Sequence, residues 1–140
     1  MNYLIDTNAL SELTKIKGDS KVIQWFNETP DYELFLSVLT IAEIRKGIEK
    51  LKDSSKKDVL TTWLQTELDE RFKNRILSFG ISEAMIWGKL TARMENTGIN
   101  LPIIDSMIAA IALSKNAILV TRNTKDFEAT GVKLLNPWLE

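Results

Sequence analysis

The 140-residue chain contains no cysteine and no histidine. Without cysteine it forms neither a disulfide nor a thiolate metal site, which fits a reducing compartment such as the cytoplasm. Without histidine it cannot use imidazole as a general base, as the partner of a nucleophile or as a zinc ligand. Catalysis near neutral pH would therefore depend on carboxylates, lysines, hydroxyl groups or metal ions held by oxygen ligands.

Long hydrophobic runs are missing too. No apolar stretch reaches the ~18 residues that cross a bilayer, and the start of the chain lacks the basic segment of a signal peptide. We therefore expect a cytoplasmic protein with no membrane segment. The net charge of −1 gives no general basic surface, although the segment from Lys46 to Asp58 is rich in lysine.

The pattern of the chain predicts one α/β domain. Its 44% hydrophobic and 26% charged residues are typical of a single globular unit. Apolar, strand-like segments alternate with helical patterns, which favours a mainly parallel sheet. Strands are expected at residues 2–5, 33–38, 75–80 and 117–121, with an edge strand at 133–138. The helices expected between the second and fourth strands include residues 40–51, 57–72 and a helix that Ser82 caps and that runs to about residue 97. Two connections hold two helices each, so one helix of each pair should lie crosswise or protrude.

Polar residues follow two of these strands, where parallel sheets bind ligands. Asp6 comes directly after the first strand, and Thr121, Arg122 and Asn123 come after the fourth. Both positions also have a purely structural explanation. Asp6 could cap the helix that follows it, and Asn123 could cap a short helix.

Two further acids stand at predicted helix starts. Glu43 closes a T-x-x-E capping box that begins at Thr40, and that role alone could explain it. Asp105 shares a helix face with Ile108 and Ala109, which carries it toward the core. A buried carboxylate is costly unless it is paired, protonated or bound to a metal, and a helix N-terminus offsets only ~0.3 to 1 kcal/mol.

Asp6, Glu43 and Asp105 would repel one another if the sheet brought them together without a cation. Oxygen ligands with no histidine or thiolate select hard ions, Mg²⁺ or Mn²⁺. A carboxylate-bound Mg²⁺ activates water and stabilises the charge that develops in phosphoryl chemistry. The acids therefore indicate a metal-dependent hydrolase that acts on phosphate esters.

Four segments resemble the successive motifs of the PIN-domain ribonucleases, and specifically the VapC-type toxins of bacterial toxin–antitoxin pairs. They are LIDTNALSEL, LSVLTIAEIRKGIEKL, LPIIDSMIAAIAL and LVTRNTKDFEATGVKLLNPW. The similarity runs through the whole chain in the family's order. It implies a single PIN-like nuclease domain over residues 1–140, a three-layer α/β/α sandwich with a small, mainly parallel central sheet.

The resemblance also assigns roles to individual residues. Asp6 and Asp105 match the principal metal ligands, Glu43 matches the second-motif acid, and the family's fourth acidic position falls at Asn123. Because asparagine is a weaker ligand, we expect one stable Mg²⁺ or Mn²⁺ and a second ion recruited with RNA. Further residues expected to support the acids or contact substrate are Thr7, Asn8, Thr121, Asp126, Arg45 and Arg122.

The implied activity is endoribonuclease cleavage by metal-activated water, leaving a 5′-phosphate and a 3′-hydroxyl. The absence of histidine argues against the acid–base RNases that pass through a cyclic phosphate. The resemblance implies a homodimer and an antitoxin that covers a hydrophobic groove near the active site. Leu10, Leu13, Trp63 and Leu64 could line this groove or simply pack in the core.

Two other classes share part of this pattern. A haloacid-dehalogenase-like phosphatase also places an aspartate after its first strand, but it needs D-x-D and this chain reads D-T-N. A receiver-like signalling module needs an aspartate at the end of its third strand, where this chain reads SFGIS. RNA cleavage is therefore the preferred interpretation, with these two as alternatives.

Overall fold

The computed structural model describes residues 1–139, which fold around a five-stranded parallel sheet of order β3-β2-β1-β4-β5. The strands are β1 (Tyr3–Ile5), β2 (Leu34–Ser37), β3 (Ile76–Leu77), β4 (Ile118–Val120) and β5 (Lys133–Leu135). The predicted α/β class, parallel sheet and edge strand are all confirmed.

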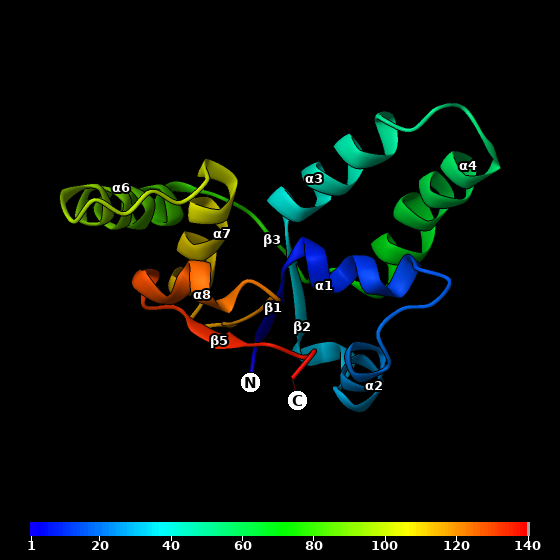
Figure 1. Ribbon diagram of the computed structural model, residues 1–140, viewed down its shortest axis with the longest axis horizontal. Helices are drawn as coiled ribbons and strands as arrows, with labels where there is room; N and C mark the ends of the chain where they lie inside the picture. Colours follow the sequence, from blue (N-terminus) through cyan, green and yellow to red (C-terminus); the bar gives the residue numbers. More distant parts are fainter. Residues whose placement is uncertain (140) are drawn as a thin grey trace.

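The helices are α1 (Thr7–Ser11), α2 (Ser20–Glu28), α3 (Val38–Glu49), α4 (Ser55–Thr62), α5 (Asp69–Arg71), α6 (Ile81–Asn96), α7 (Ile103–Ser114) and α8 (Thr124–Phe127). A π-helical stretch, Trp63–Leu68, joins α4 to α5. In the connection from β2 to β3, both α3 and α4 protrude from the sheet, at the upper right of Figure 1, and not one of the two as predicted. No helix within residues 1–139 is long and apolar enough to cross a membrane.

The sheet separates two hydrophobic cores, because neighbouring strand residues point to opposite faces. Leu4 and Leu119 pack with α6 and α7 on one face. Ile5 and Val120 pack with α1 and α2 on the other. The three-layer α/β/α arrangement that the resemblance implied is therefore confirmed.

The strand order places the ends of β1 and β4 side by side. β1 pairs with β2 on one side and with β4 on the other, so the connections change direction at β1. Such a point forms a crevice for ligands outside the carboxyl ends of the strands. The order also differs from the 2-1-3-4-5 order of receiver-like folds, which counts against that alternative.

Two helix starts differ from the sequence prediction. The N-cap of α3 is Ser37, whose hydroxyl accepts a hydrogen bond from the Thr40 amide at 3.1 Å, so the capping box at Thr40 is wrong. The N-cap of α6 is Gly80 rather than Ser82, and the Glu83 carboxylate accepts the Gly80 amide at 2.9 Å. Because α3 begins directly at the strand end, Glu43 lies beyond its first turn and is not a cap.

Candidate active site

Asp6 lies at the carboxyl end of β1 and is also the N-cap of α1. One carboxylate oxygen accepts the Thr7 amide at 2.9 Å, and the other accepts the Thr121 hydroxyl at 2.8 Å. Only 5% of Asp6 is exposed. Burial raises the pKa of this carboxyl, the two hydrogen bonds lower it, and nearby Glu43 raises it further, with a net upward shift. Asp6 is therefore a cap and a buried acid at the sheet edge at the same time.

The Thr121 hydroxyl fixes the orientation of Asp6. Its oxygen accepts hydrogen bonds from the Asn8 side-chain amide at 3.3 Å and from the Asn123 backbone amide at 3.1 Å. A hydroxyl has one proton and two lone pairs. Since both lone pairs are engaged, the single proton of Thr121 points to Asp6 Oδ2. Asn8 is held in turn, because its Oδ1 accepts the Arg122 backbone amide at 3.3 Å.

Glu43 projects from α3 and is tied to α1 through Thr7. The Thr7 hydroxyl donates to Glu43 Oε1 at 2.7 Å and lies 3.3 Å from the hydroxyl oxygen of Thr40. Thr40 is itself held by Ser37. The sequence analysis did not select Ser37 or Thr40 as supports for the site. The available signal was a serine directly after a strand, which is a preferred N-cap residue.

Asp105 lies in the first turn of α7. It is half-buried, less deeply than the sequence pattern predicted, whereas Ile108 and Ala109 on the same face are fully buried. Burial raises the pKa of Asp105 to about 6, with further contributions from the charges of Asp6, Glu43 and Asp126. These contributions show that carboxylates from four distant segments gather at one place.

Asn123 stands where the fourth acidic position was expected, and Asp126 lies three residues further along the chain. Asn123 occupies the N-cap position of α8, but its side chain makes no capping hydrogen bond, so the prediction of a side-chain cap is wrong. Its backbone amide supports Thr121 instead. Of the segment that follows β4, Asp126 adds negative charge near Asp105, a smaller contribution than those of Asp6 and Glu43.

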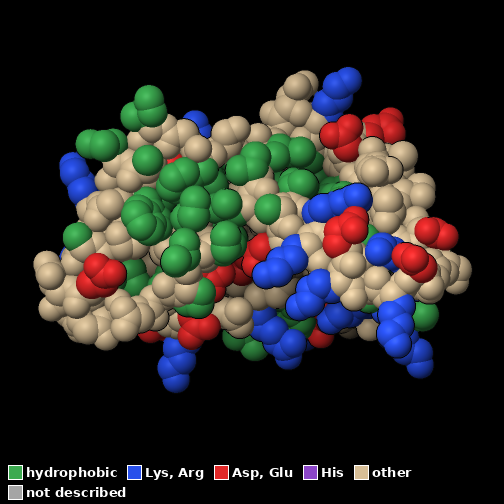
Figure 2. All heavy atoms as spheres, turned by 90° about the horizontal axis from the view of Figure 1, so that it is seen from above, with side chains coloured by type: hydrophobic (Ala, Val, Ile, Leu, Met, Phe, Trp, Pro, Cys, Tyr) green, Lys and Arg blue, Asp and Glu red, His purple; other side chains and the backbone are tan. Residues whose placement is uncertain are grey.

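In the described part of the chain, these acids have no basic partner. Within residues 1–139, no ion pair includes Asp6, Glu43, Asp105 or Asp126. Arg45 is exposed and pairs with Glu49 at 2.9 Å, and the Arg122 guanidinium lies 5.4 Å from the ring centre of Trp138. Figure 2 looks onto this edge of the molecule and shows acidic side chains near its middle, between a hydrophobic area and several lysines and arginines.

The site fits a hard cation in its charge and donor atoms. It offers carboxylate, hydroxyl and amide oxygens, and unpaired carboxylates that repel one another. As placed, no three acidic side chains of residues 1–139 surround a common point as the ligands of one ion would. Ligation by Asp6, Glu43 and Asp105 therefore requires side-chain rotation. Among these, Glu43 has the longest side chain, with the most rotatable bonds.

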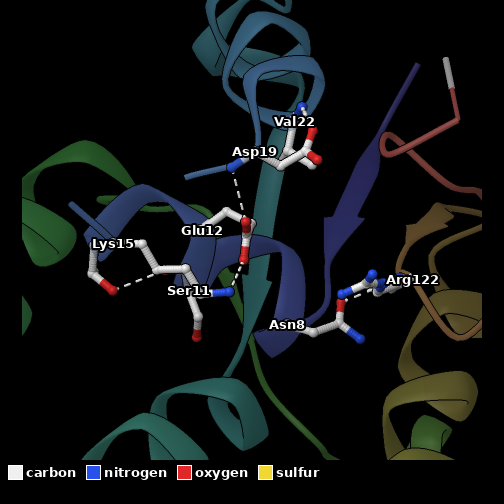
Figure 3. A network of polar contacts seen from close by, with 8 residues as sticks. Asn8, Ser11, Glu12, Lys15, Asp19, Val22 and Arg122 are labelled. Carbon is white, nitrogen blue, oxygen red and sulfur yellow. Dashed lines mark hydrogen bonds and ion pairs between the residues drawn. The ribbon is translucent and has the colours of Figure 1, made fainter. Parts of the chain in front are cut away.

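Two buried groups that the sequence analysis did not select hold the surrounding elements. The Glu12 carboxylate, 5% exposed, accepts the Asp19 amide at 3.0 Å and binds Lys15, which fixes the turn between α1 and α2 (Figure 3). Beside Asp105, the Ser106 hydroxyl accepts Trp87 Nε1 at 2.8 Å and so joins α7 to α6. The Trp87–Ser106 contact has no local sequence signal, because it joins two helices, whereas the spacing of Glu12 and Lys15, three residues apart, was a local signal for an ion pair.

Comparison with known proteins agrees with the fold and the motifs. Residues 3–133 match the family model described as PIN domain. The plasmid stability protein StbB of Pseudomonas syringae pv. tomato is 35% identical, covering 96% of this chain and 97% of the relative. The VapC ribonuclease Y4jK of Sinorhizobium fredii is 30% identical, covering 96% of each.

A solved structure is similar over nearly the whole chain. The crystal structure of FitAcB from Neisseria gonorrhoeae contains a chain with a TM-score of 0.92 and 32% identity, covering 97% of this chain and 98% of that one. The family model spans most of the chain, and the alignments with this chain cover 96 to 97% of the two relatives. The chain belongs to the PIN domain family.

Proposed function

We propose that this protein is a Mg²⁺- or Mn²⁺-dependent endoribonuclease that acts as the toxin of a toxin–antitoxin pair. One observation carries the proposal: the charges of Asp6, Glu43 and Asp126 act on Asp105 at the carboxyl edge of the sheet, and within residues 1–139 none of the four acids has a basic partner. The likeness to a relative named as a VapC ribonuclease supports the same activity. The absence of histidine is consistent with hydrolysis by activated water.

In this account each acid has a defined task. Asp6, held by the Thr7 amide and the Thr121 hydroxyl, presents fixed oxygens at the end of β1. Glu43 and Asp105 approach from α3 and α7 and complete the set of ligands. A divalent cation bound there would supply an activated water and offset the charge that develops on the scissile phosphate. Asp126 takes the place of the missing fourth acid at Asn123.

The cytoplasmic RNA substrate would approach across the carboxyl edge. Arg122 is the second residue after β4 and Arg45 lies on the exposed surface of α3, so both are placed to contact backbone phosphates. Such contacts position the RNA without reading its sequence. Arg45 would have to exchange its exposed pairing with Glu49 for a phosphate, which costs little because surface ion pairs are weak.

A groove on this protein leads to the acids and would hold an antitoxin segment. A cavity of about 340 Å³ between α1, α3 and α4 is lined by apolar residues such as Leu60 and Trp63 and also by Thr7 and Glu43. A segment lying there would cover Glu43. Of the groove residues expected from the sequence, Trp63 lines the cavity, whereas Leu10 is fully buried in the core.

We also propose that the chain forms a homodimer through the exposed ends of α6 and α7. Ile81 and Met85 stand one turn apart on α6 and are 85% and 64% exposed, and Ile103 at the start of α7 is 68% exposed. Figure 2 shows a hydrophobic area on the face of the molecule that is seen from above. Contiguous exposed apolar surface of this kind is typical of an interface.

A comparison of three substrates tests the catalytic proposal. The protein is incubated with Mn²⁺ and either labelled RNA, p-nitrophenyl phosphate or acetyl phosphate. We expect cleavage of the RNA alone, and loss of that cleavage in EDTA. Hydrolysis of p-nitrophenyl phosphate with intact RNA would point to a phosphatase, and phosphorylation by acetyl phosphate to a receiver-like module.

A further inference from the structure

A second hollow lies beside the acids, between the α6–α7 loop and α8. Its volume is about 700 Å³. It is lined by Ile99, Asn100, Leu101, Pro102, Lys125, Asp126, Glu128 and Ala129. Pro102 is the N-cap of α7, and Asp105 lies in the first turn of that helix. Three residues of helix span only about 4.5 Å, so the hollow opens next to the acidic site.

Both walls of the hollow are held in place by hydrogen bonds. On the loop side, Gly98 adopts a left-handed conformation with φ of 75°, and the Ile99 amide donates to the Met94 carbonyl at 2.9 Å. This closes the end of α6 in a form that favours glycine. On the other side, the Arg93 guanidinium donates to the carbonyls of Ala129 and Thr130 at 3.3 and 3.4 Å. Because α6 thus anchors both walls, the hollow is pre-organised, which lowers the cost of binding.

The lining combines flat apolar contacts with a few polar groups. Ile99, Leu101 and Pro102 offer apolar surface against which a ring can pack. Asn100 adds an amide that donates and accepts, and Glu128 adds a carboxylate that only accepts. The carboxylates of Asp126 and Glu128 would repel a phosphate inside the hollow. A nucleobase is uncharged and fits this chemistry, while Lys125 can meet a backbone phosphate at the rim.

We propose that this hollow binds an unpaired RNA base next to the scissile phosphate and prefers a base with an exocyclic amino group. Adenine, cytosine and guanine carry an amino group with two N–H donors, which Glu128 and the Asn100 oxygen can accept together, whereas uracil has no amino group and offers only its single ring N–H. Recognition of a single-stranded base by packing and edge contacts is common in RNA-binding sites. The inference rests on the proposed ribonuclease function and adds the substrate feature that selects the cleavage position.

Binding of four fluorescent RNA 12-mers tests this proposal. One is all uridine, and the others carry a single central adenosine, cytidine or guanosine. Fluorescence anisotropy with the full chain in EDTA measures affinity without cleavage. We expect the three substituted RNAs to bind at least about 10-fold more tightly than the uridine RNA, since one added hydrogen bond to a charged group contributes about 1.5 kcal/mol or more.

Substitutions in the hollow identify the cause of the preference. Asn100→Ala and Glu128→Ala should each reduce it to less than 2-fold, whereas Asn27→Ala and Glu28→Ala, exposed on the distant α2, should leave it unchanged. Equal binding of all four RNAs by the wild type, or a preference that survives in both hollow variants, would overturn the proposal. A preference without any cleavage in Mn²⁺ would keep the base site and contradict the nuclease function. Cleavage in Mn²⁺ without a preference among the four RNAs would support the nuclease function and contradict the base site.

Discussion

At the end of β4, the proton of the Thr121 hydroxyl can point only to Asp6, because Asn8 and Asn123 occupy its lone pairs. Thr121→Val should therefore weaken RNA cleavage by about 10- to 100-fold and raise the Mn²⁺ concentration needed for half-maximal activity. Thr121→Ser keeps the hydroxyl, so it should retain most of the RNA cleavage and a Mn²⁺ dependence close to that of the wild type. Equal Mn²⁺ dependence of the valine variant and the wild type would contradict this role.

Asp105 should make the metal-free protein less stable at neutral pH. Its pKa is raised to about 6 in the folded state, so the folded protein binds more protons than the unfolded chain between about pH 4 and pH 6. Stability therefore falls as the pH rises through this range. Asp105→Asn removes the charge and should raise the free energy of unfolding at pH 7 by about 1 kcal/mol after allowance for solvent screening of this half-buried group.

Thermal unfolding in EDTA measures this effect. The variant should melt about 2 to 4 °C above the wild type at pH 7, and the difference should disappear below about pH 4. The same variant should lose RNA cleavage. A melting temperature of the variant at pH 7 equal to or below that of the wild type would show that the charge of Asp105 does not destabilise the folded protein.

The principal residues of the site could be named from the sequence, because an acid at a strand end or on a helix face is visible in the pattern. Asp6, Glu43 and Asp105 all contribute charge to one place. The contact partners could not be named: the Thr7–Glu43 bond joins residues 36 positions apart, and the Thr121–Asp6 bond joins residues 115 apart. Such contacts depend on strand order, which local patterns do not contain.

At the scale of elements, the turn between α1 and α2 depends on close packing at Gly18. A Cβ added there would lie 2.5 Å from the Glu12 carbonyl oxygen, which belongs to the backbone and cannot move freely. Gly18→Ala should therefore destabilise the protein by about 1 to 3 kcal/mol. Gly88→Ala is the matched control: it lies inside α6 with nothing within 4 Å of an added Cβ.

Because alanine favours helices, Gly88→Ala should stabilise the protein by about 0.5 to 1 kcal/mol. Urea unfolding of the two variants and the wild type measures both differences in the free energy of unfolding. A neutral or stabilising effect of Gly18→Ala would mean that the backbone of the turn shifts to accommodate a methyl group, which would contradict the prediction.

The existence and type of the long elements could be predicted, because hydrophobic periodicity is local. The residues at which these elements begin were harder to predict. Thr40 and Ser82 looked like caps, yet α3 begins after Ser37 and α6 after Gly80, where Glu83 supplies the cap from inside the helix. Several residues in each segment can act as caps, and tertiary packing decides between them. The π-helical stretch Trp63–Leu68 within the predicted helix of residues 57–72 likewise has no local signal.

At the scale of the whole molecule, a homodimer through α6 and α7 would make stability depend on protein concentration. The melting temperature of the wild type should rise between about 1 and 100 µM. Met85→Lys places a charge on the exposed hydrophobic surface and should abolish this dependence, whereas Lys21→Ala on α2 should not. Monomeric wild-type protein in light scattering at 100 µM would contradict the dimer.

The central claim is that Asp6 holds a divalent cation with which the protein cleaves RNA. The most direct test incubates 3′-labelled RNA with wild-type protein or Asp6→Asn, each in Mn²⁺ and in EDTA, and analyses the new 5′ ends. The account predicts 5′-phosphate fragments from the wild type in Mn²⁺ only. Equal cleavage by Asp6→Asn, or undiminished cleavage in EDTA, would contradict it.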